Sequence, residues 1–94
     1  MPSIKIAHIR EQGQDLIIVP LDETFGRRPS DDRKVTINKI QSVAKKVGLT
    51  GRVVPVWPSG EEEMRFLAPE PWHPFFRSIS WSWLVSNLNR QLDW

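Results

Sequence analysis

The chain has 94 residues and a formal net charge of +2, enough for one small domain but too short for two domains of about 50 residues or more. It contains no cysteine, which excludes disulfides, thiolate metal sites and a cysteine nucleophile, and we expect a reducing compartment, the cytoplasm. Its longest apolar run, Leu16 to Val19, is far shorter than the roughly 20 residues of a membrane span, so we expect no membrane partner.

Residues 4–21 contain two apolar runs on either side of a Gln12-Gly13 turn, and this pattern predicts a β-hairpin. With these two residues as the loop, Arg10 faces Asp15, which pairs opposite charges. The aliphatic pairs are then Ile9 with Leu16, Ala7 with Ile18 and Ile6 with Val19. One face carries Ile4, Ile6, Ile17 and Val19, and the other carries Ala7, Ile9, Leu16 and Ile18. Strands that are apolar on both faces are typical of the middle of a sheet.

Residues 31–47 have the pattern of an amphipathic helix. Ser30 is the expected N-cap, Asp31 and Asp32 complement the positive end of the helix dipole, and Gly48 follows as the C′ residue. The stripe expected to be buried consists of Thr36, Ile37, Ile40, Val43, Ala44 and Val47. The lysines expected to be exposed are Lys34, Lys39, Lys45 and Lys46.

Residues 52–68 predict a second hairpin, whose loop contains Pro58, Ser59 and Gly60. Pro55 has no N–H to donate, so we expect its strand to lie at a sheet edge or to carry a bulge. The expected cross-strand pairs are Trp57 with Met64, Pro55 with Phe66, and Val53 with Ala68, and this is the face expected to be buried.

Three prolines at positions 69, 71 and 74 exclude regular structure at the start of the C-terminal region, so residues 69–79 are predicted to form an irregular aromatic arm. Residues 80–92 predict a helix with Ser78 or Ser80 as its cap. Its apolar residues recur at helical spacing, at Trp81, Leu84, Val85, Leu88 and Leu92. Trp83 lies on the opposite side of this helix, toward the arm or toward a second molecule.

The predicted element order is ββαββα over residues 1–94, as a single small α+β domain. The architecture expected from this order is a four-stranded antiparallel sheet with two helices packed on one face.

Motifs of catalysis and metal binding are not found in the sequence. The two histidines, His8 and His73, lack the spacing of metal ligands, and no nucleophile-elbow pattern surrounds the serines near His73. Three consecutive carboxylates, Glu61 to Glu63, cannot converge on one ion from a strand or tight turn, and Gly26 to Pro29 is not a P-loop. We therefore predict no enzymatic activity, no cofactor and no metal.

Basic residues are concentrated in residues 27–52, which contain eight of them against two aspartates, a local net charge of +6. The rest of the chain has a net charge of −4. Such a segment is typical of a surface that contacts nucleic acid phosphates, although an ordinary solvated helix face has the same composition. The candidate phosphate contacts are Arg27, Arg28, Arg33, Lys34, Lys45 and Lys46.

Aromatic residues are concentrated near the C-terminus, where six of the nine lie. A small domain buries only part of such a set, and an exposed aromatic cluster is typical of a protein interface. The candidate interface residues are Trp72, Phe75, Phe76, Ile79, Trp83 and Trp94; alternatively, the arm folds back and buries them within the chain. The function favoured by the sequence is a non-enzymatic protein–protein interaction module that self-associates, as a homodimer, and the alternative is a nucleic-acid-binding domain.

Overall fold

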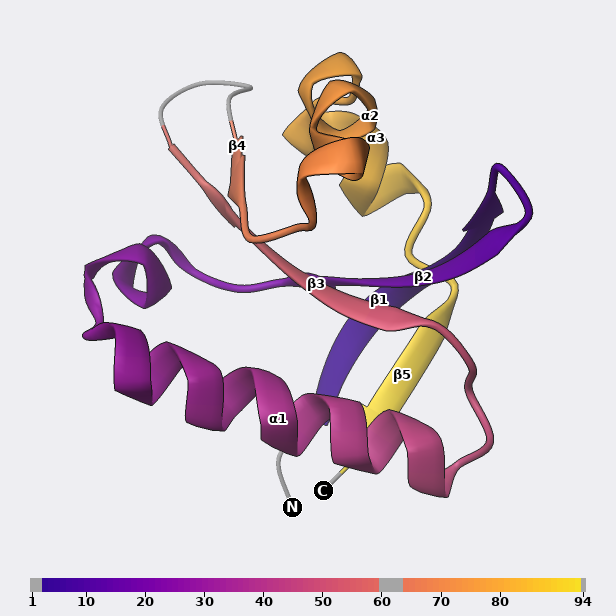
Figure 1. The fold of residues 1–94 in the computed structure, drawn as a ribbon, viewed down its shortest axis with the longest axis horizontal. Coiled ribbons are helices and arrows are strands. Elements are labelled where there is room, and N and C mark those ends of the chain that lie inside the picture. The colour runs from indigo at the N-terminus through magenta and orange to yellow at the C-terminus, as the bar shows by residue number, and fades with distance from the viewer. Residues whose placement is uncertain (1–2, 60–63, 94) are drawn as a thin grey trace.

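Residues 3–59 and 64–93, which the computed structural model describes, form an α+β fold with a five-stranded sheet and helices on both of its faces (Figure 1). The order of strands across the sheet is β4-β3-β2-β1-β5. Along the chain the elements are β1 (Ser3–Glu11), β2 (Gln14–Pro20), the 3-10 helix η1 (Glu23–Arg27), α1 (Ser30–Lys46), β3 (Arg52–Pro58), β4 (Met64–Phe66), the 3-10 helix η2 (Glu70–Trp72), α2 (His73–Ser78), α3 (Trp81–Ser86) and β5 (Arg90–Asp93).

The first hairpin, β1–β2, has the predicted register. Arg10 pairs with Asp15, Ile9 with Leu16, and Ala7 with Ile18. Both turn residues have positive φ, 51° at Gln12 and 77° at Gly13, as a two-residue turn that matches the strand twist requires. The central position predicted for these strands is also confirmed, because β2 lies between β1 and β3.

The prediction of an all-antiparallel sheet is wrong, because β2 and β3 run parallel, with Ile17 paired to Val53 and Val19 to Pro55. Parallel neighbours need a long crossover connection, and here η1 and α1 supply it. The crossover brings the second hairpin to the free side of β2 rather than to the side of β1.

The register of the second hairpin differs by one residue from the prediction. Val56 pairs with Phe66 and Trp57 with Arg65. The carbonyl of Pro55 accepts a hydrogen bond from the N–H of Leu67 at 3.1 Å, but Pro55 has no N–H to return, and the β4 ladder ends at Phe66. Of the two placements that Pro55 predicted for its strand, a sheet edge or a bulge, the edge is wrong, because β3 lies between β2 and β4, and the short β4 occupies the edge.

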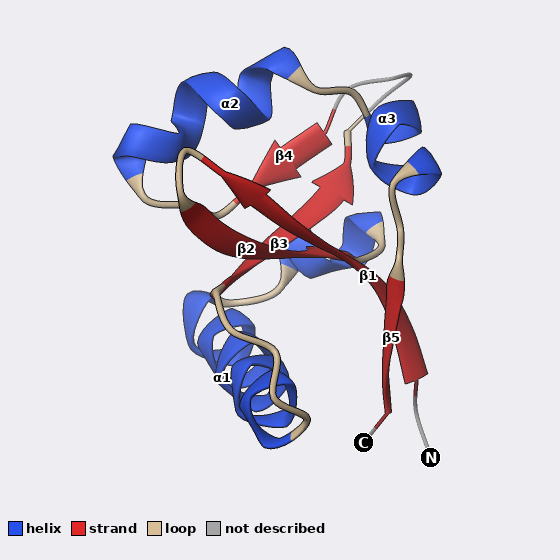
Figure 2. Ribbon diagram, turned by 90° about the vertical axis from the view of Figure 1, so that its right-hand side faces the viewer, coloured by secondary structure: helices blue, strands red, loops and turns tan. Residues whose placement is uncertain are grey.

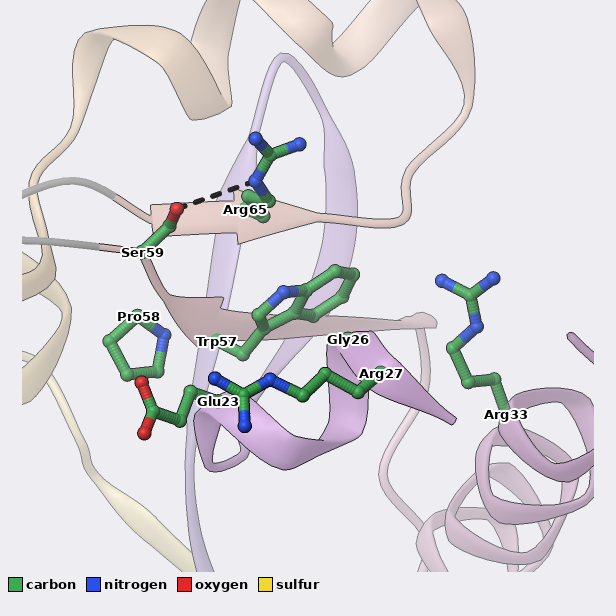
Figure 3. Close-up of a pocket in the computed structure, with 8 residues that line it drawn as sticks. All are labelled: Glu23, Gly26, Arg27, Arg33, Trp57, Pro58, Ser59 and Arg65. Atoms are coloured by element: carbon green, nitrogen blue, oxygen red, sulfur yellow. Dashed lines mark hydrogen bonds between the residues drawn. The ribbon is translucent and has the colours of Figure 1, made fainter. Parts of the chain in front are cut away.

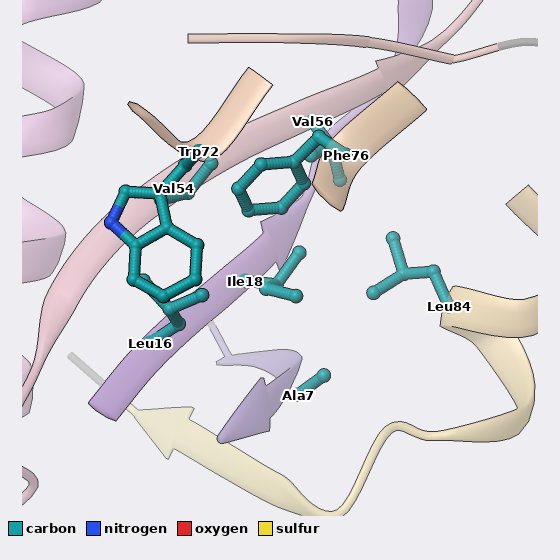
Figure 4. Close-up of a cluster of buried hydrophobic side chains, with 8 residues drawn as sticks. All are labelled: Ala7, Leu16, Ile18, Val54, Val56, Trp72, Phe76 and Leu84. Atoms are coloured by element: carbon teal, nitrogen blue, oxygen red, sulfur yellow. The ribbon is translucent and has the colours of Figure 1, made fainter. Parts of the chain in front are cut away.

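The helices cover opposite faces of the sheet, which corrects the expectation that both pack on one face (Figure 2). Helix α1 packs on a cluster of buried side chains formed by Ile6, Ile17, Val19, Ile40, Ala44, Val53 and Leu92. On the other face, η2, α2 and α3 cover Ala7, Leu16, Ile18, Val54, Val56, Trp72, Phe76 and Leu84 (Figure 4). The physical reason is that the central strands are apolar on both sides, so each side needs its own cover.

Helix α1 presents the predicted faces, with Ile40 and Ala44 buried and the lysines exposed. Its ends differ in part from the prediction. The helix begins at Ser30, preceded by Pro29, and no side-chain cap forms there. At the other end Gly48 has a φ of 82°, and the N–H of Leu49 bonds to the carbonyl of Ala44, which is a Schellman turn.

One residue of the predicted buried stripe lies outside the core, because Val47 is 59% exposed. Val47 is the C-cap residue, at the point where the chain leaves the helix. Leu49, two residues later, packs against the cluster instead.

The predicted irregular arm over residues 69–79 is in fact mostly helical, because η2 and α2 occupy residues 70–78 and Pro74 lies in the first turn of α2, where a proline is tolerated. The predicted C-terminal helix over residues 80–92 is correct only in its first half. Ser80 caps α3, as one of the two predicted caps, by accepting a hydrogen bond from the Trp83 N–H at 3.1 Å. The helix ends at Ser86, and residues 90–93 form β5, which pairs with the first half of β1. Asn89 fixes this pairing, because its side chain bonds to both the N–H and the carbonyl of His8. Leu92, which fits a helical stripe in sequence, is buried in the cluster under α1.

The β5 pairing predicts that Leu92→Ala lowers the free energy of unfolding by about 2–5 kcal/mol, since it leaves a cavity under α1. The matched control is Val85→Ala, because Val85 is 50% exposed on α3, and it should change that free energy by at most about 0.5 kcal/mol. Urea denaturation followed by tryptophan fluorescence measures both. Equal small effects would contradict the packing of β5 in the core.

Candidate functional site

A pocket of about 410 Å³ lies where η1, the start of α1 and the β3–β4 hairpin meet (Figure 3). It is lined by Glu23, Gly26, Arg27, Arg33, Trp57, Pro58, Ser59 and Arg65. Three of these side chains are arginines and one is a glutamate, so the described lining carries a net charge of +2. We call it the arginine pocket.

Trp57 forms the centre of the arginine pocket and fixes η1 on the sheet. It lies on β3 with 7% of its surface exposed, and the buried ring of Phe25 packs on it with 5.2 Å between ring centroids. Gly26 approaches the indole so closely that a Cβ atom there would lie 2.4 Å from Trp57 Nε1. The sequence needs glycine at this position because only a residue without a side chain leaves room for the indole.

The three arginines reach the pocket from three different elements. Arg27 comes from η1, Arg33 from α1 and Arg65 from β4, and they surround Trp57 from different sides (Figure 3). Arg65 Nε donates to Ser59 Oγ at 3.4 Å, and Arg33 Nη2 donates to Ser30 Oγ at 3.4 Å. Both bonds are long, so they hold the guanidinium groups loosely.

The Nε atom of Arg33 is buried and has no hydrogen-bond partner within the described residues. A buried donor without an acceptor costs about 1–3 kcal/mol, and more when the group is charged.

The start of η1 has a hydrogen bond between Thr24 and Asp22, the residue that precedes the helix. The Thr24 hydroxyl donates to the Asp22 carboxylate, and this bond holds the pKa of Asp22 below its usual value. A lowered pKa means that the ionised form stabilises η1, and this contribution is lost as the pH falls through that pKa.

The structure divides the sequence-predicted basic residues into two groups. Arg27 and Arg33 line the arginine pocket, Arg28 is exposed beside it, and Lys34 lines a smaller adjoining hollow. Lys45 and Lys46 lie at the far end of α1, about 18 Å from Arg33 along the helix axis at the usual rise of 1.5 Å per residue. The predicted surface is therefore not one continuous patch.

Arg65 is the pocket residue that the sequence prediction missed. It lies outside residues 27–52, and the predicted register placed it on the opposite face from Trp57. The signal that identifies it is the observed pairing with Trp57, which puts both side chains on the same face.

Two hollows continue from the arginine pocket along α1. The first, of about 170 Å³, is lined by Ser30, Arg33, Lys34, Ile37 and Leu67. The second, of about 290 Å³, is lined by Ile37, Arg52, Val53, Pro55, Leu67, Ala68 and Pro69. Because neighbouring hollows share Arg33, Ile37 or Leu67, they form a row with basic side chains along an apolar floor.

The predicted interface residues are mostly covered by the chain itself. Trp72 and Phe76 are buried on the sheet, with 7% and 1% of their surfaces exposed. Phe75, Ile79 and Trp83 are half-buried, and Phe75 meets Trp83 edge-on at 6.3 Å. Trp94 lies outside the described residues.

Both histidines bond to backbone carbonyls, His8 Nε2 to Thr50 at 2.9 Å and His73 Nε2 to Ala68 at 3.0 Å. Among the described residues, no three His, Asp or Glu side chains lie close enough to share a metal ion. The Glu61–Glu63 run lies outside the described residues.

No protein-family model, curated protein or solved structure matches this chain. Within the described ranges, no helix combines the length and the apolar character that crossing a membrane requires.

The close contact at Gly26 predicts that Gly26→Ala displaces Trp57 or η1 and lowers the free energy of unfolding by about 1–3 kcal/mol, as overpacking does. Arg27→Ala is the matched control on the same 3-10 helix, because it removes an exposed side chain and leaves the Trp57 contact intact. Urea denaturation followed by tryptophan fluorescence compares the two variants. A Gly26→Ala protein as stable as the control would show that η1 is not held against Trp57.

Proposed function

We propose that this chain is a non-enzymatic binding module that holds the phosphate groups of a nucleic acid strand at the arginine pocket. The observation that carries the proposal is the approach of Arg27, Arg33 and Arg65 to one pocket from three separate elements. A guanidinium group presents parallel N–H donors that match two phosphate oxygens, which makes arginine a favoured residue for phosphate recognition.

A strand is favoured over a small free anion because the row of hollows extends beyond the pocket. Lys34 lines the middle hollow and Arg52 the last one, so positive charge follows the row. The apolar floor, which includes Ile37 and Leu67, offers a surface for sugar or base groups between these charges. Proteins that bind single strands combine a positive groove with such surfaces.

The proposal predicts binding that falls steeply with salt and depends little on sequence, because phosphate contacts carry no base information. The double variant Arg27→Ala/Arg65→Ala should weaken binding of every sequence alike. It should also flatten the plot of log affinity against log salt by roughly 1.4, about 0.7 for each phosphate of a single strand that is no longer neutralised. Fluorescence anisotropy with a mixed-sequence single-stranded oligonucleotide at several salt concentrations measures both effects.

The matched control is Lys45→Ala/Lys46→Ala, which removes the same charge from the far end of α1. It should leave the salt slope nearly unchanged. An equal loss in both double variants would show diffuse attraction to a basic surface, and no binding at low salt would refute the proposal.

Self-association through the C-terminal aromatic region is a second candidate function. The observation that favours it is Val85, which is 50% exposed on α3, the helix that carries the half-buried Trp81 and Trp83. Trp72 and Phe76 are buried in the core, but Val85 leaves an apolar surface exposed on α3.

In a homodimer built on this region, Val85→Glu should halve the solution mass, because a carboxylate would be desolvated without a partner at the contact. The fold should persist, since Val85 is half exposed. Val35→Glu is the matched control on α1, where Val35 is 67% exposed on the opposite side of the sheet. Light scattering after gel filtration gives the mass, and a wild-type chain that is monomeric at high concentration would eliminate this candidate.

A further inference from the structure

Two stretches of the central strands extend past the edge strands that cover them. Strand β4 covers β3 only from Pro55 onward, because the last bond between them joins the Leu67 N–H to the Pro55 carbonyl. At the opposite edge, β5 pairs with β1 only from Ser3 to Ile6, although β1 continues to Glu11. Alternate backbone groups beyond these points face outward, and such a row is a template for pairing with another chain.

An amide side chain occupies the first uncovered position on β3. Gln41, on α1, accepts a hydrogen bond from the Val53 N–H at 2.9 Å and donates one to the Gly51 carbonyl at 3.1 Å. In a parallel pair, a residue of the neighbouring strand bonds in the same way to the residues before and after its partner, which here would be Arg52. The Gln41 amide therefore takes the place of one residue of a parallel strand.

A second amide side chain does the same on β1. Asn89 Oδ1 accepts a hydrogen bond from the His8 N–H at 2.8 Å, and Asn89 Nδ2 donates one to the His8 carbonyl at 2.9 Å. These are the two bonds that a residue of an antiparallel neighbour exchanges with its partner. His8 is the next residue after Ile6 whose backbone faces this edge, so both amides lie directly beyond the end of an edge strand.

The two edge strands themselves are protected by their length and charge. Strand β4 has three residues and carries the exposed Arg65, and β5 has four residues, with Arg90 and Asp93 exposed. Short edges with charged side chains pair poorly with other chains. The uncovered stretches of β3 and β1 are thus the places at which a strand would add most easily, and these are the places that Gln41 and Asn89 occupy.

We propose that Gln41 and Asn89 prevent the sheet from adding a strand of a second copy of this chain, because each amide takes the place of the missing neighbour. A second copy is the relevant partner because two copies present the same edge to each other, and a two-fold axis aligns such edges antiparallel. Nucleic acid binding at the arginine pocket is not required for this role. A dimer built on α3 would leave both of these edges unchanged.

The test replaces Gln41 by leucine, which has a similar size but no amide. In Gln41→Leu at low concentration, the Val53 N–H should exchange with solvent about tenfold faster than in the wild type, because it has lost its acceptor. At high concentration the mass should rise to about twice that of the wild type at the same concentration, and the Val53 N–H should regain its protection. Hydrogen exchange followed by NMR and light scattering after gel filtration measure the two effects.

Two variants on α1 are the matched controls. Gln41→Lys also lacks the amide, but its charge at the edge should block pairing, so it should keep the wild-type mass. Val43→Ala removes part of a half-buried side chain that packs under the sheet and leaves Gln41 in place, so it should keep that mass too. Association of either control to the same degree as Gln41→Leu would overturn the proposal, because lost stability alone would then explain it.

A folded Gln41→Leu protein with the wild-type mass at high concentration would also overturn the proposal, since Gln41 would then only hold the start of β3 against α1. Should Gln41→Leu fail to fold, Asn89→Leu carries the same test at β1, with the His8 N–H as the exchange probe. A folded Asn89→Leu protein with the wild-type mass would then overturn the proposal, and association above that mass would support it.

Discussion

Four consecutive residues of β2, Leu16 to Val19, have at most 1% of their surfaces exposed, and they alternate between the two hydrophobic clusters. Because neighbouring side chains of a strand point to opposite faces, this run requires cover on both sides of the sheet. Helix α1 covers one side, and η2, α2 and α3 cover the other. Trp72 and Phe76 are therefore buried because the apolar face of β2 needs cover. Most of the C-terminal aromatic residues contribute to the core, which leaves few of them for contact with a partner.

The parallel pairing of β2 and β3 determines where the arginine pocket lies. Parallel strands have their carboxyl ends at the same edge of the sheet, so η1, which follows β2, meets Trp57 and Pro58 at the end of β3. Helix α1 begins at that edge too, and this brings Arg33 to the pocket. An antiparallel β3 would have placed Trp57 at the opposite edge from Arg27, and these residues would not have met.

The sequence predicts the parts of the fold in which contacts are local. The β1–β2 register follows from a two-residue turn and from matched side chains, so it could be predicted pair by pair. Strand β5 could not be predicted from the sequence, because Leu92 fits both a helical repeat with Leu84 and Leu88 and an alternating strand. The free edge of β1, a contact distant in sequence, decides in favour of the strand. Arg65 was missed for a related reason, since a one-residue difference in register moves a side chain to the other face of the sheet.

The fold accounts for the two lysines in the last turn of α1 but not for the arginines near its start. Lys45 and Lys46 occupy the last turn, and Asp31 and Asp32 the first, which complements the helix dipole at both ends. Arg33, the fourth residue of α1, lies near the positive end, where a cation gains nothing from the dipole, and its Nε has no acceptor within the described residues. Arg27 and Arg65 add two more positive charges at the same place. Local rules of stability are broken most often at functional sites, and the phosphate ligand that we propose would offset this concentration of positive charge.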